Sequence, residues 1–165
     1  MQRCVLALGS NLGDRGQILF QAIGSIAKIA NTSLEGVSPI VESEALTPTG
    51  PNPADPKYLN CVVEIKTTLE PTQLLRELNE IEAKFGRERS EKWASRTLDI
   101  DIITFGKLEL TTEELTIPHP RAHERGFVLV PWMLLDDNAS LPGFGLVTKL
   151  AEQFQSEVWV IDDVD

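Results

Sequence analysis

The sequence contains little that points to secretion or to a membrane. It has two cysteines, Cys4 and Cys61, among its 165 residues, and both lie in short apolar runs. Small thiols in such runs are usually buried and reduced, as in cytosolic proteins. No apolar run reaches about 18 residues, and no charged segment precedes an apolar one as in a signal peptide. We therefore expect a cytoplasmic protein with no membrane partner.

Basic residues are outnumbered by acidic ones. Lys and Arg total 15 against 25 Asp and Glu, and the formal net charge is −10. A surface that binds nucleic acid is usually basic, so we expect no nucleic-acid partner. Any local cluster of cations is more notable in this background, because it must attract an anionic ligand against the overall field.

The usual motifs for zinc and for nucleotide phosphates are also missing. His119 and His123 lie four residues apart, but HPRAH lacks the glutamate of zinc proteases, and Pro120 disfavours a helix there. Residues 9–13, GSNLG, lack the Lys-Ser/Thr ending of the phosphate-binding P-loop. They are better interpreted as a capped turn between a strand and a helix. Any phosphoryl chemistry here is therefore not of the P-loop type.

The hydrophobic pattern predicts one domain, residues 1–165, without repeats or linkers. Its elements follow the order strand, helix, strand, strand, helix, strand, which is typical of a ferredoxin-like antiparallel sheet. Helices later in the chain can cover the second face, so the expected fold is α+β with three layers, α-β-α. Four prolines predict a loop at 47–57. The expected strands are 4–8, 32–46, 58–68, 96–102 and 158–161, and the expected helices are 18–30, 71–85, 127–135 and 146–154.

The segment RTLDIDI, residues 96–102, carries the most information. Strand side chains alternate between faces, so Asp99 and Asp101 should share one face and Leu98, Ile100 and Ile102 the other. Neighbouring carboxylates repel each other unless a cation lies between them, and Mg²⁺ is commonly held by one or two carboxylates together with phosphates. The alternative is a half-buried strand with a solvated face, which the alternation by itself favours.

Two other groups of residues converge with this acidic pair. A basic segment directly precedes it, and aromatic and amide side chains are available for a flat heterocycle. Each group also has an ordinary explanation, as a solvated run of charges or as core aromatics. Glu82 is assigned to the polar side of its helix, without a strong role. The residues concerned are Arg87, Arg89, Lys92 and Arg96, and Tyr58, Asn60, Trp93 and Phe127.

Taken together, these motifs resemble the 6-hydroxymethyl-7,8-dihydropterin pyrophosphokinase family of folate biosynthesis, from about Val5 to about Pro131. The resemblance rests on LALGSNLGDR, YLN, GRER, RTLDIDI and IPHPRAHERGFVLVP. It implies a magnesium-dependent enzyme that transfers the pyrophosphoryl group of ATP to the hydroxymethyl oxygen of the pterin and releases AMP. The implied partners are these two small molecules, and we expect a monomer.

The resemblance also implies a role for individual residues. Two Mg²⁺ ions would be held by Asp99 and Asp101. The pterin ring would lie between Tyr58 and Phe127, with Asn60 bonded to its edge. Arg87, Trp93 and Arg96 would be catalytic and, with Lys92, would belong to a mobile loop. The implied ATP-binding residues are Lys92, Ile102, Thr116, His119 and Arg125.

The chain departs from the family pattern at several positions. Ala94-Ser95 stands where Gly-Pro is usual, Lys92 stands where arginine is common, and Val41 takes the place of a tyrosine. Lysine does not replace arginine in bidentate contacts. Alignment of residues 42–56 is ambiguous, since either Ser43 or Thr47 can take the place of the pterin-loop threonine. A small-molecule binding module without turnover is the rival interpretation.

Overall fold

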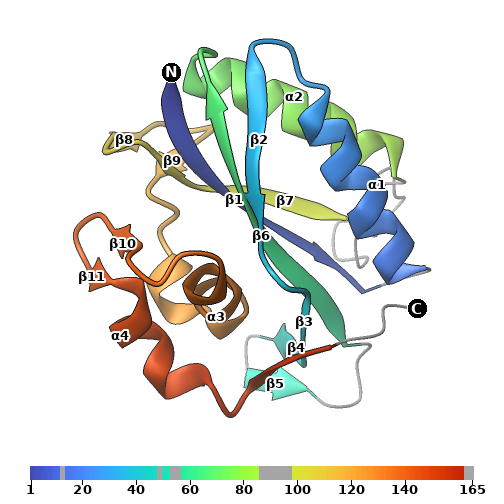
Figure 1. Cartoon of the computed structure of the whole chain (residues 1–165), viewed down its shortest axis with the longest axis vertical. Helices are drawn as coiled ribbons and strands as arrows, with labels where there is room; N and C mark the ends of the chain where they lie inside the picture. The colour runs from blue at the N-terminus through green and yellow to red at the C-terminus, as the bar shows by residue number, and fades with distance from the viewer. Residues whose placement is uncertain (12–13, 48–49, 53–56, 86–97, 162–165) are drawn as a thin grey trace.

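A sheet of six strands forms the centre of the protein (Figure 1). The computed structural model describes residues 1–11, 14–47, 50–52, 57–85 and 98–161. The strands pair antiparallel in the order β12–β3–β6–β1–β7, and β2 pairs with the second half of β6. They are β1 (Gln2–Ser10), β2 (Thr32–Val37), β3 (Val41–Ser43), β6 (Tyr58–Thr67), β7 (Asp99–Phe105) and β12 (Val158–Val160).

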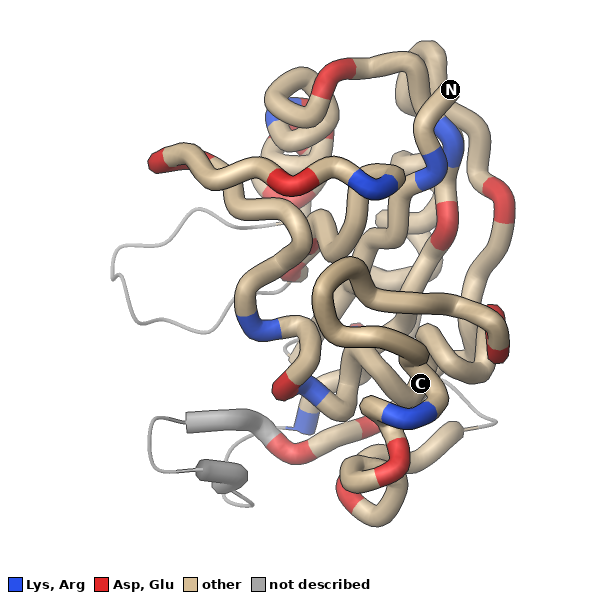
Figure 2. Tube along the Cα trace, turned by 90° about the vertical axis from the view of Figure 1, so that its left-hand side faces the viewer, with Lys and Arg blue, Asp and Glu red and all other residues tan. Residues whose placement is uncertain are grey.

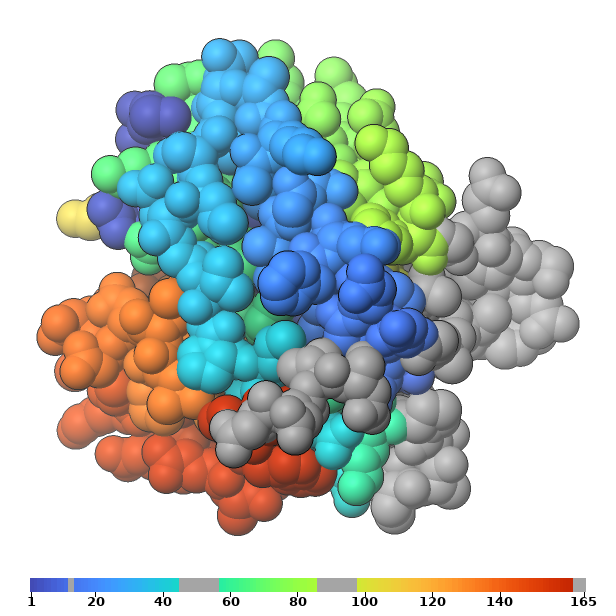
Figure 3. Space-filling view, turned by 45° about the vertical axis from the view of Figure 1, so that its right-hand side comes forward, coloured from blue at the N-terminus to red at the C-terminus, as the bar shows by residue number. Residues whose placement is uncertain are grey.

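Two helices cover one face of this sheet. α1 (Arg15–Ala27) and α2 (Pro71–Lys84) lie side by side, as the space-filling view shows in blue and yellow-green (Figure 3). Asp14 caps α1 by accepting a hydrogen bond from Gln17 N at 3.3 Å, which satisfies a free amide of the first turn. Both helices pack on Cys4, Leu6 and Leu8 of β1, with equivalent residues of β6 and β7, to form the larger core.

The opposite face is covered by the C-terminal helices. α3 (Gly126–Leu135) is apolar around most of its circumference, as expected for a helix packed on several sides, and α4 (Val147–Ala151) lies against it. They bury Val5, Ala7 and Val62 in a second core. The order β2–β6–β1–β7 with helices on both faces confirms the predicted α+β, ferredoxin-like, three-layer fold. Among the described residues, no helix is long and apolar enough to cross a membrane.

Short elements complete the fold at the margins of the sheet. The predicted extended segment at 32–46 is divided by residues 38–40, which include Pro39, and again at residue 44, so that it contains β2, β3 and the start of a further strand. The remaining elements are β8 (Leu110–Thr111), β9 (Thr116–Ile117), η1 (Ala122–Glu124), β10 (Ser140–Leu141), β11 (Gly145–Leu146) and η2 (Glu152–Phe154).

The loop predicted at 47–57 is wrong for part of that range. β4 (Ala45–Thr47) and β5 (Gly50–Asn52) pair as an antiparallel hairpin, with Leu46 opposite Pro51. Both strands of an isolated two-stranded ribbon are edge strands, where proline is tolerated because an outward amide is not needed. The prolines therefore indicated a segment outside the main sheet, but they did not predict that part of it forms two paired strands.

The assignment of Glu82 to a polar, solvated helix face is also wrong. Its side chain is buried between α2 and the sheet, and Glu82 Oε2 accepts a hydrogen bond from Ile100 N at 2.8 Å. β7 is the last strand of the sheet on its side, so alternate amides of β7 point away from β1 and need another partner. The buried carboxylate satisfies one of them, at the residue between Asp99 and Asp101.

Candidate active site

A pocket of about 480 Å³ opens on the α3 side of the sheet, where β1 ends and β6 and β7 begin. Because β1 is antiparallel to both neighbours, its last residues lie beside their first ones. Gly9 pairs with Asn60 on one side and with Asp99 on the other, and Ala7 pairs with Val62 and Asp101. The lining residues are Ala7, Leu8, Gly9, Ser43, Glu44, Tyr58, Asn60, Asp99, Asp101, Arg121, Arg125 and Phe127.

The predicted alternation of β7 is confirmed. Leu98, Ile100 and Ile102 are buried in the core beneath α1 and α2, whereas Asp99 and Asp101 line the pocket on the other face. Tyr58 and Asn60 open into the same pocket because β6 and β7 both pair with β1, and Phe127 reaches it from α3. Segments far apart in the sequence therefore meet at one site.

Gly9 is a site residue that the sequence analysis missed. A Cβ atom at this position would lie 2.7 Å from Asn60 Oδ1 and 3.6 Å from Tyr58 Cδ1. Real Cβ contacts are not this short, so only glycine leaves Asn60 its observed place. The signal was available as a glycine at the end of a strand, where a close approach is a common reason for one.

Asn60 is held by a neighbour on β3. Its Nδ2 donates to Ser43 Oγ at 3.1 Å, and the amide is buried. Ser43 also lines the pocket and pairs with Tyr58 through the backbone. Ser43, one of the two candidates left open by the sequence, therefore lies at the site. The side chain of Thr47 lies outside the described residues.

Two aromatic residues line the same pocket as this amide. Tyr58 is the first residue of β6, Phe127 lies in the first turn of α3, and both are half-buried in the pocket lining. The guanidinium of Arg125 lies 5.6 Å from the centroid of the Phe127 ring, within the range of a cation–π contact. The pocket thus combines aromatic faces with a fixed hydrogen-bonding group.

Cations lie next to the acidic pair. Arg125 Nη1 is 3.6 Å and His119 Nε2 is 3.9 Å from Asp101 Oδ2. In Figure 2, charges of both signs are interspersed along the described trace, so the net negative charge does not exclude cations from this site. Burial lowers the pKa of Arg125 from its ordinary value, which Asp101 opposes, but an arginine stays charged at neutral pH.

His119 is oriented as a neutral donor. Its backbone amide donates to Ile103 O at 2.9 Å, and its Nδ1 accepts from Arg121 N at 3.2 Å. The proton of the neutral ring is therefore on Nε2, which faces Asp101. Burial lowers the pKa of His119 below its usual value, Asp101 opposes this, and Arg125 and Arg121 reinforce it.

Carboxylate oxygens are the ligands that Mg²⁺ prefers, and two of them on one strand face fit its habit of taking its other ligands from phosphate and water. Asp101 keeps 43% of its side chain exposed, so its oxygens remain accessible from the pocket. In the described part of the chain there is no group of three or more His, Cys, Asp or Glu side chains arranged for a metal.

Other predicted site residues lie elsewhere. Ile102 is buried in the core below α1 and α2, and Thr116 is in β9, so neither lines the pocket. Arg121 does line it, although the sequence analysis gave it no role. The predicted loop residues Arg87, Lys92, Trp93 and Arg96 lie outside the described residues.

This fold and site define a class: an α+β protein in which one pocket combines a carboxylate pair, cations and two aromatic rings with a buried amide. The chain belongs to the 7,8-dihydro-6-hydroxymethylpterin-pyrophosphokinase (HPPK) family, whose model matches residues 5–137. The resemblance inferred from the sequence motifs is thereby confirmed.

Named relatives agree with this membership. The chain is 40% identical over 149 residues to the 2-amino-4-hydroxy-6-hydroxymethyldihydropteridine pyrophosphokinase of Haemophilus influenzae, covering 90% of this chain and 91% of that protein. It is 43% identical over 126 residues to the enzyme of the same name from Bacillus subtilis, covering 76% and 73%.

Solved structures show the same fold. A Plasmodium falciparum HPPK-DHPS triple mutant superposes with a TM-score of 0.72 at 15% identity, over 94% of this chain. This chain spans 44% of the length of that protein. At such low identity the likeness shows the fold alone.

Proposed function

We propose that this protein transfers the pyrophosphoryl group of ATP to the hydroxymethyl oxygen of 6-hydroxymethyl-7,8-dihydropterin and releases AMP, in folate biosynthesis. The observation that carries the proposal is that Gly9 of β1 pairs with Asn60 of β6 on one side and with Asp99 of β7 on the other. This pairing brings the ring-binding amide beside the acidic pair. Relatives with this enzyme name support it at 40% identity over most of the chain. We further propose a monomeric, cytoplasmic protein in which residues 1–165 form one domain.

The pterin would occupy the slot between Tyr58 and Phe127. A flat ring gains dispersion and offset stacking from both aromatic faces. Asn60 supplies an amide that can both donate and accept, and its bond to Ser43 fixes its orientation before the pterin arrives. A preorganised polar group loses little entropy on binding and discriminates against ligands that leave it unpaired.

ATP would lie across the acidic pair. Asp99 and Asp101 would hold Mg²⁺, for which we propose two ions, and the bound metal supplies neutralisation of the phosphate oxygens. Arg125 adds a fixed positive charge, and His119 can donate from Nε2 to a phosphate oxygen. From the family resemblance we also propose that Arg87, Arg96 and Trp93 are catalytic. Lys92, Ile102 and Thr116 would contact ATP, the latter two from outside the pocket lining.

The proposed reaction is a transfer at the β-phosphorus of ATP. The hydroxymethyl oxygen forms a bond to it and gives up its proton to water, while the bond to the oxygen bridging the α-phosphate breaks, so AMP leaves with that oxygen. Such transfers depend on positioning and on charge stabilisation more than on covalent participation by the protein. In this proposal the pocket supplies positioning through the pterin ring held at β6. It supplies charge stabilisation through the charged groups on β7 and before α3.

Product analysis tests the proposal directly. Purified protein is incubated with Mg²⁺, ATP and the hydroxymethyl-dihydropterin, and the nucleotides are separated by chromatography. We expect equal amounts of AMP and pterin pyrophosphate, with no AMP when the pterin is omitted. ADP as the product, or no pterin-dependent nucleotide product, would contradict the proposal, and binding of both ligands without turnover would favour the rival binding module.

A further inference from the structure

The C-terminal strand supports a strand of the pocket from outside the family-matched residues. β12 lies beyond residue 137, where the family match ends, and it pairs with β3 (Figure 1). Val158 pairs with Ser43 and Trp159 with Glu42. β3 has three residues and carries Ser43 into the pocket, so β12 supplies the outer hydrogen-bonding partner of a short strand that the site depends on.

Four side chains meet behind this strand. Trp159 Nε1 donates to Glu42 Oε1 at 3.3 Å, and Arg15 Nη1 donates to Glu42 Oε2 at 3.1 Å. Arg15 Nη1 also donates to Lys57 O at 2.8 Å, and Lys57 Nζ lies 5.3 Å from the centroid of the Trp159 ring. We call Arg15, Glu42, Lys57 and Trp159 the rim cluster. It joins α1, β3, the residue before β6, and β12.

The rim cluster adjoins the pocket along the backbone but not through side chains. Glu42 directly precedes Ser43 in β3, and Lys57 directly precedes Tyr58 in β6. Adjacent strand residues point to opposite faces, so Glu42 faces α1 while Ser43 faces the pocket. None of the four cluster residues lines the pocket. The direct route from the cluster to a ligand is therefore the backbone that positions Ser43 and Tyr58.

The central contact is well placed to fix those positions. The side chains of Arg15 and Glu42 are 22% and 18% exposed, so water screens this pair less than an ordinary surface pair. One guanidinium bonds both a carboxylate and a main-chain carbonyl, and charge-assisted bonds of this type are stronger than neutral ones. Arg15 thus ties the start of β6 to β3, the two strands that carry Tyr58 and Ser43.

We propose that the rim cluster is a positioning device for the pterin slot, so that pterin affinity depends on Arg15, Glu42 and the C-terminal Trp159, while ATP affinity does not. The proposal rests on the proposed function, because it takes the slot of Tyr58, Ser43 and Asn60 as the pterin site. Ser43 Oγ accepts the bond that orients Asn60, so a shift of β3 moves the amide as well. The acidic pair is on β7, separated from β3 by β6 and β1.

The test compares Arg15→Ala with wild type by calorimetry, using the pterin in one titration and Mg²⁺ with a non-hydrolysable ATP analogue in the other. We expect pterin binding to weaken about tenfold, the size of a lost charge-assisted bond, and analogue binding to change less than twofold. Glu42→Gln and Trp159→Phe each remove one contact and should give smaller losses in the same direction.

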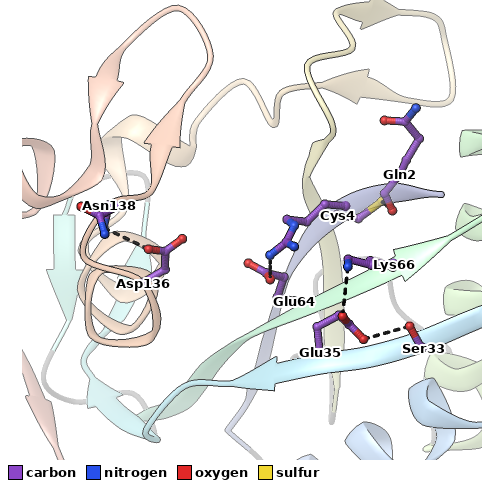
Figure 4. A network of polar contacts seen from close by, with 9 residues as sticks. Gln2, Cys4, Ser33, Glu35, Glu64, Lys66, Asp136 and Asn138 are labelled. Atoms are coloured by element: carbon purple, nitrogen blue, oxygen red, sulfur yellow. Dashed lines mark hydrogen bonds and ion pairs between the residues drawn. The ribbon is translucent and has the colours of Figure 1, made fainter.

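A matched control lies at the other end of the sheet. Glu35 Oε1 is 3.4 Å from Lys66 Nζ, an ion pair between β2 and the far end of β6 (Figure 4). Glu35→Gln should leave both affinities unchanged, although it too breaks an ion pair between two elements of the fold.

Several outcomes would overturn the positioning role. One is an unchanged pterin affinity in Arg15→Ala. Another is a loss of affinity in Arg15→Ala that is equal for the pterin and the ATP analogue. The third is a loss of pterin affinity in Glu35→Gln as large as that in Arg15→Ala. If Arg15→Ala does not fold, Glu42→Gln and Trp159→Phe are compared with wild type in the same two titrations, and the same criteria apply to them. Wild-type protein that binds the pterin but releases no AMP would refute the proposed reaction and leave the positioning role intact. Wild-type protein that binds no pterin would refute both.

Discussion

Gly9→Ala tests the geometry of the pocket most directly, because it adds one methyl group between the two halves of the site. The new Cβ would lie 2.7 Å from Asn60 Oδ1. Asn60 is buried and held by Ser43 at 3.1 Å, so it cannot rotate away without breaking that bond. The substitution therefore forces either overpacking or an unpaired buried amide.

The opposing effects can be compared in size. Replacing glycine by alanine restricts the unfolded chain and stabilises by about 0.4–1 kcal/mol where the backbone permits it. Overpacking costs roughly 1–3 kcal/mol, and an unpaired buried amide costs about the same. The destabilisation by the clash should exceed the stabilisation through the unfolded chain, with a net loss of about 1–2 kcal/mol of unfolding free energy. Pterin affinity should fall about tenfold, because a displaced Asn60 no longer matches the ring edge.

Urea denaturation and pterin calorimetry measure the two effects, and Gly24→Ala is the matched control. Gly24 is exposed in α1, and a Cβ there would meet nothing within 4 Å. This control should be more stable than wild type by about 0.5–1 kcal/mol and bind pterin normally. A Gly9→Ala variant with wild-type stability and pterin affinity would show that Asn60 is not confined as described.

Three further predictions concern the acidic pair, the buried carboxylate and the thiols. Asp99→Asn and Asp101→Asn should each abolish most AMP release while pterin binding and melting temperature are retained, and near-normal turnover in either would exclude the metal role. Glu82→Ala should lower the free energy of unfolding, measured by urea denaturation, by about 1–3 kcal/mol because it leaves an edge-strand amide unpaired. Glu82→Gln keeps an acceptor and should lower it less. Equal losses in the two variants would contradict this. Burial raises the pKa of Cys4 and of Cys61 to about 12, so native protein should not react with a disulfide reagent at pH 8 and should react once unfolded. Because both folded pKa values lie above the ordinary 9.0, stability should fall as the pH rises above about 9, and a flat profile up to pH 11 would refute the assignment.

Local patterns determined the site residues of each strand. Alternation along β7 placed Asp99 and Asp101 on one face, and the same pattern placed Asn60 on the non-core face of β6. Capping and apolar spacing gave α1 and α2, because a helix or strand is specified by residues a few positions apart. The family motifs identified the family for the same reason, since each motif is contiguous in the chain.

Only the tertiary structure decided how these segments meet. The sequence did not specify that Gly9 separates Asn60 from Asp99, that Ser43 lines the pocket, or that Glu82 turns inward to an edge strand. Each of these facts depends on the register between strands or on packing between elements distant in the chain. A polar residue on a helix has the same local sequence signature whether it faces water or the unpaired amide of a strand. Which of the two it faces is determined by the neighbours that the fold brings to it.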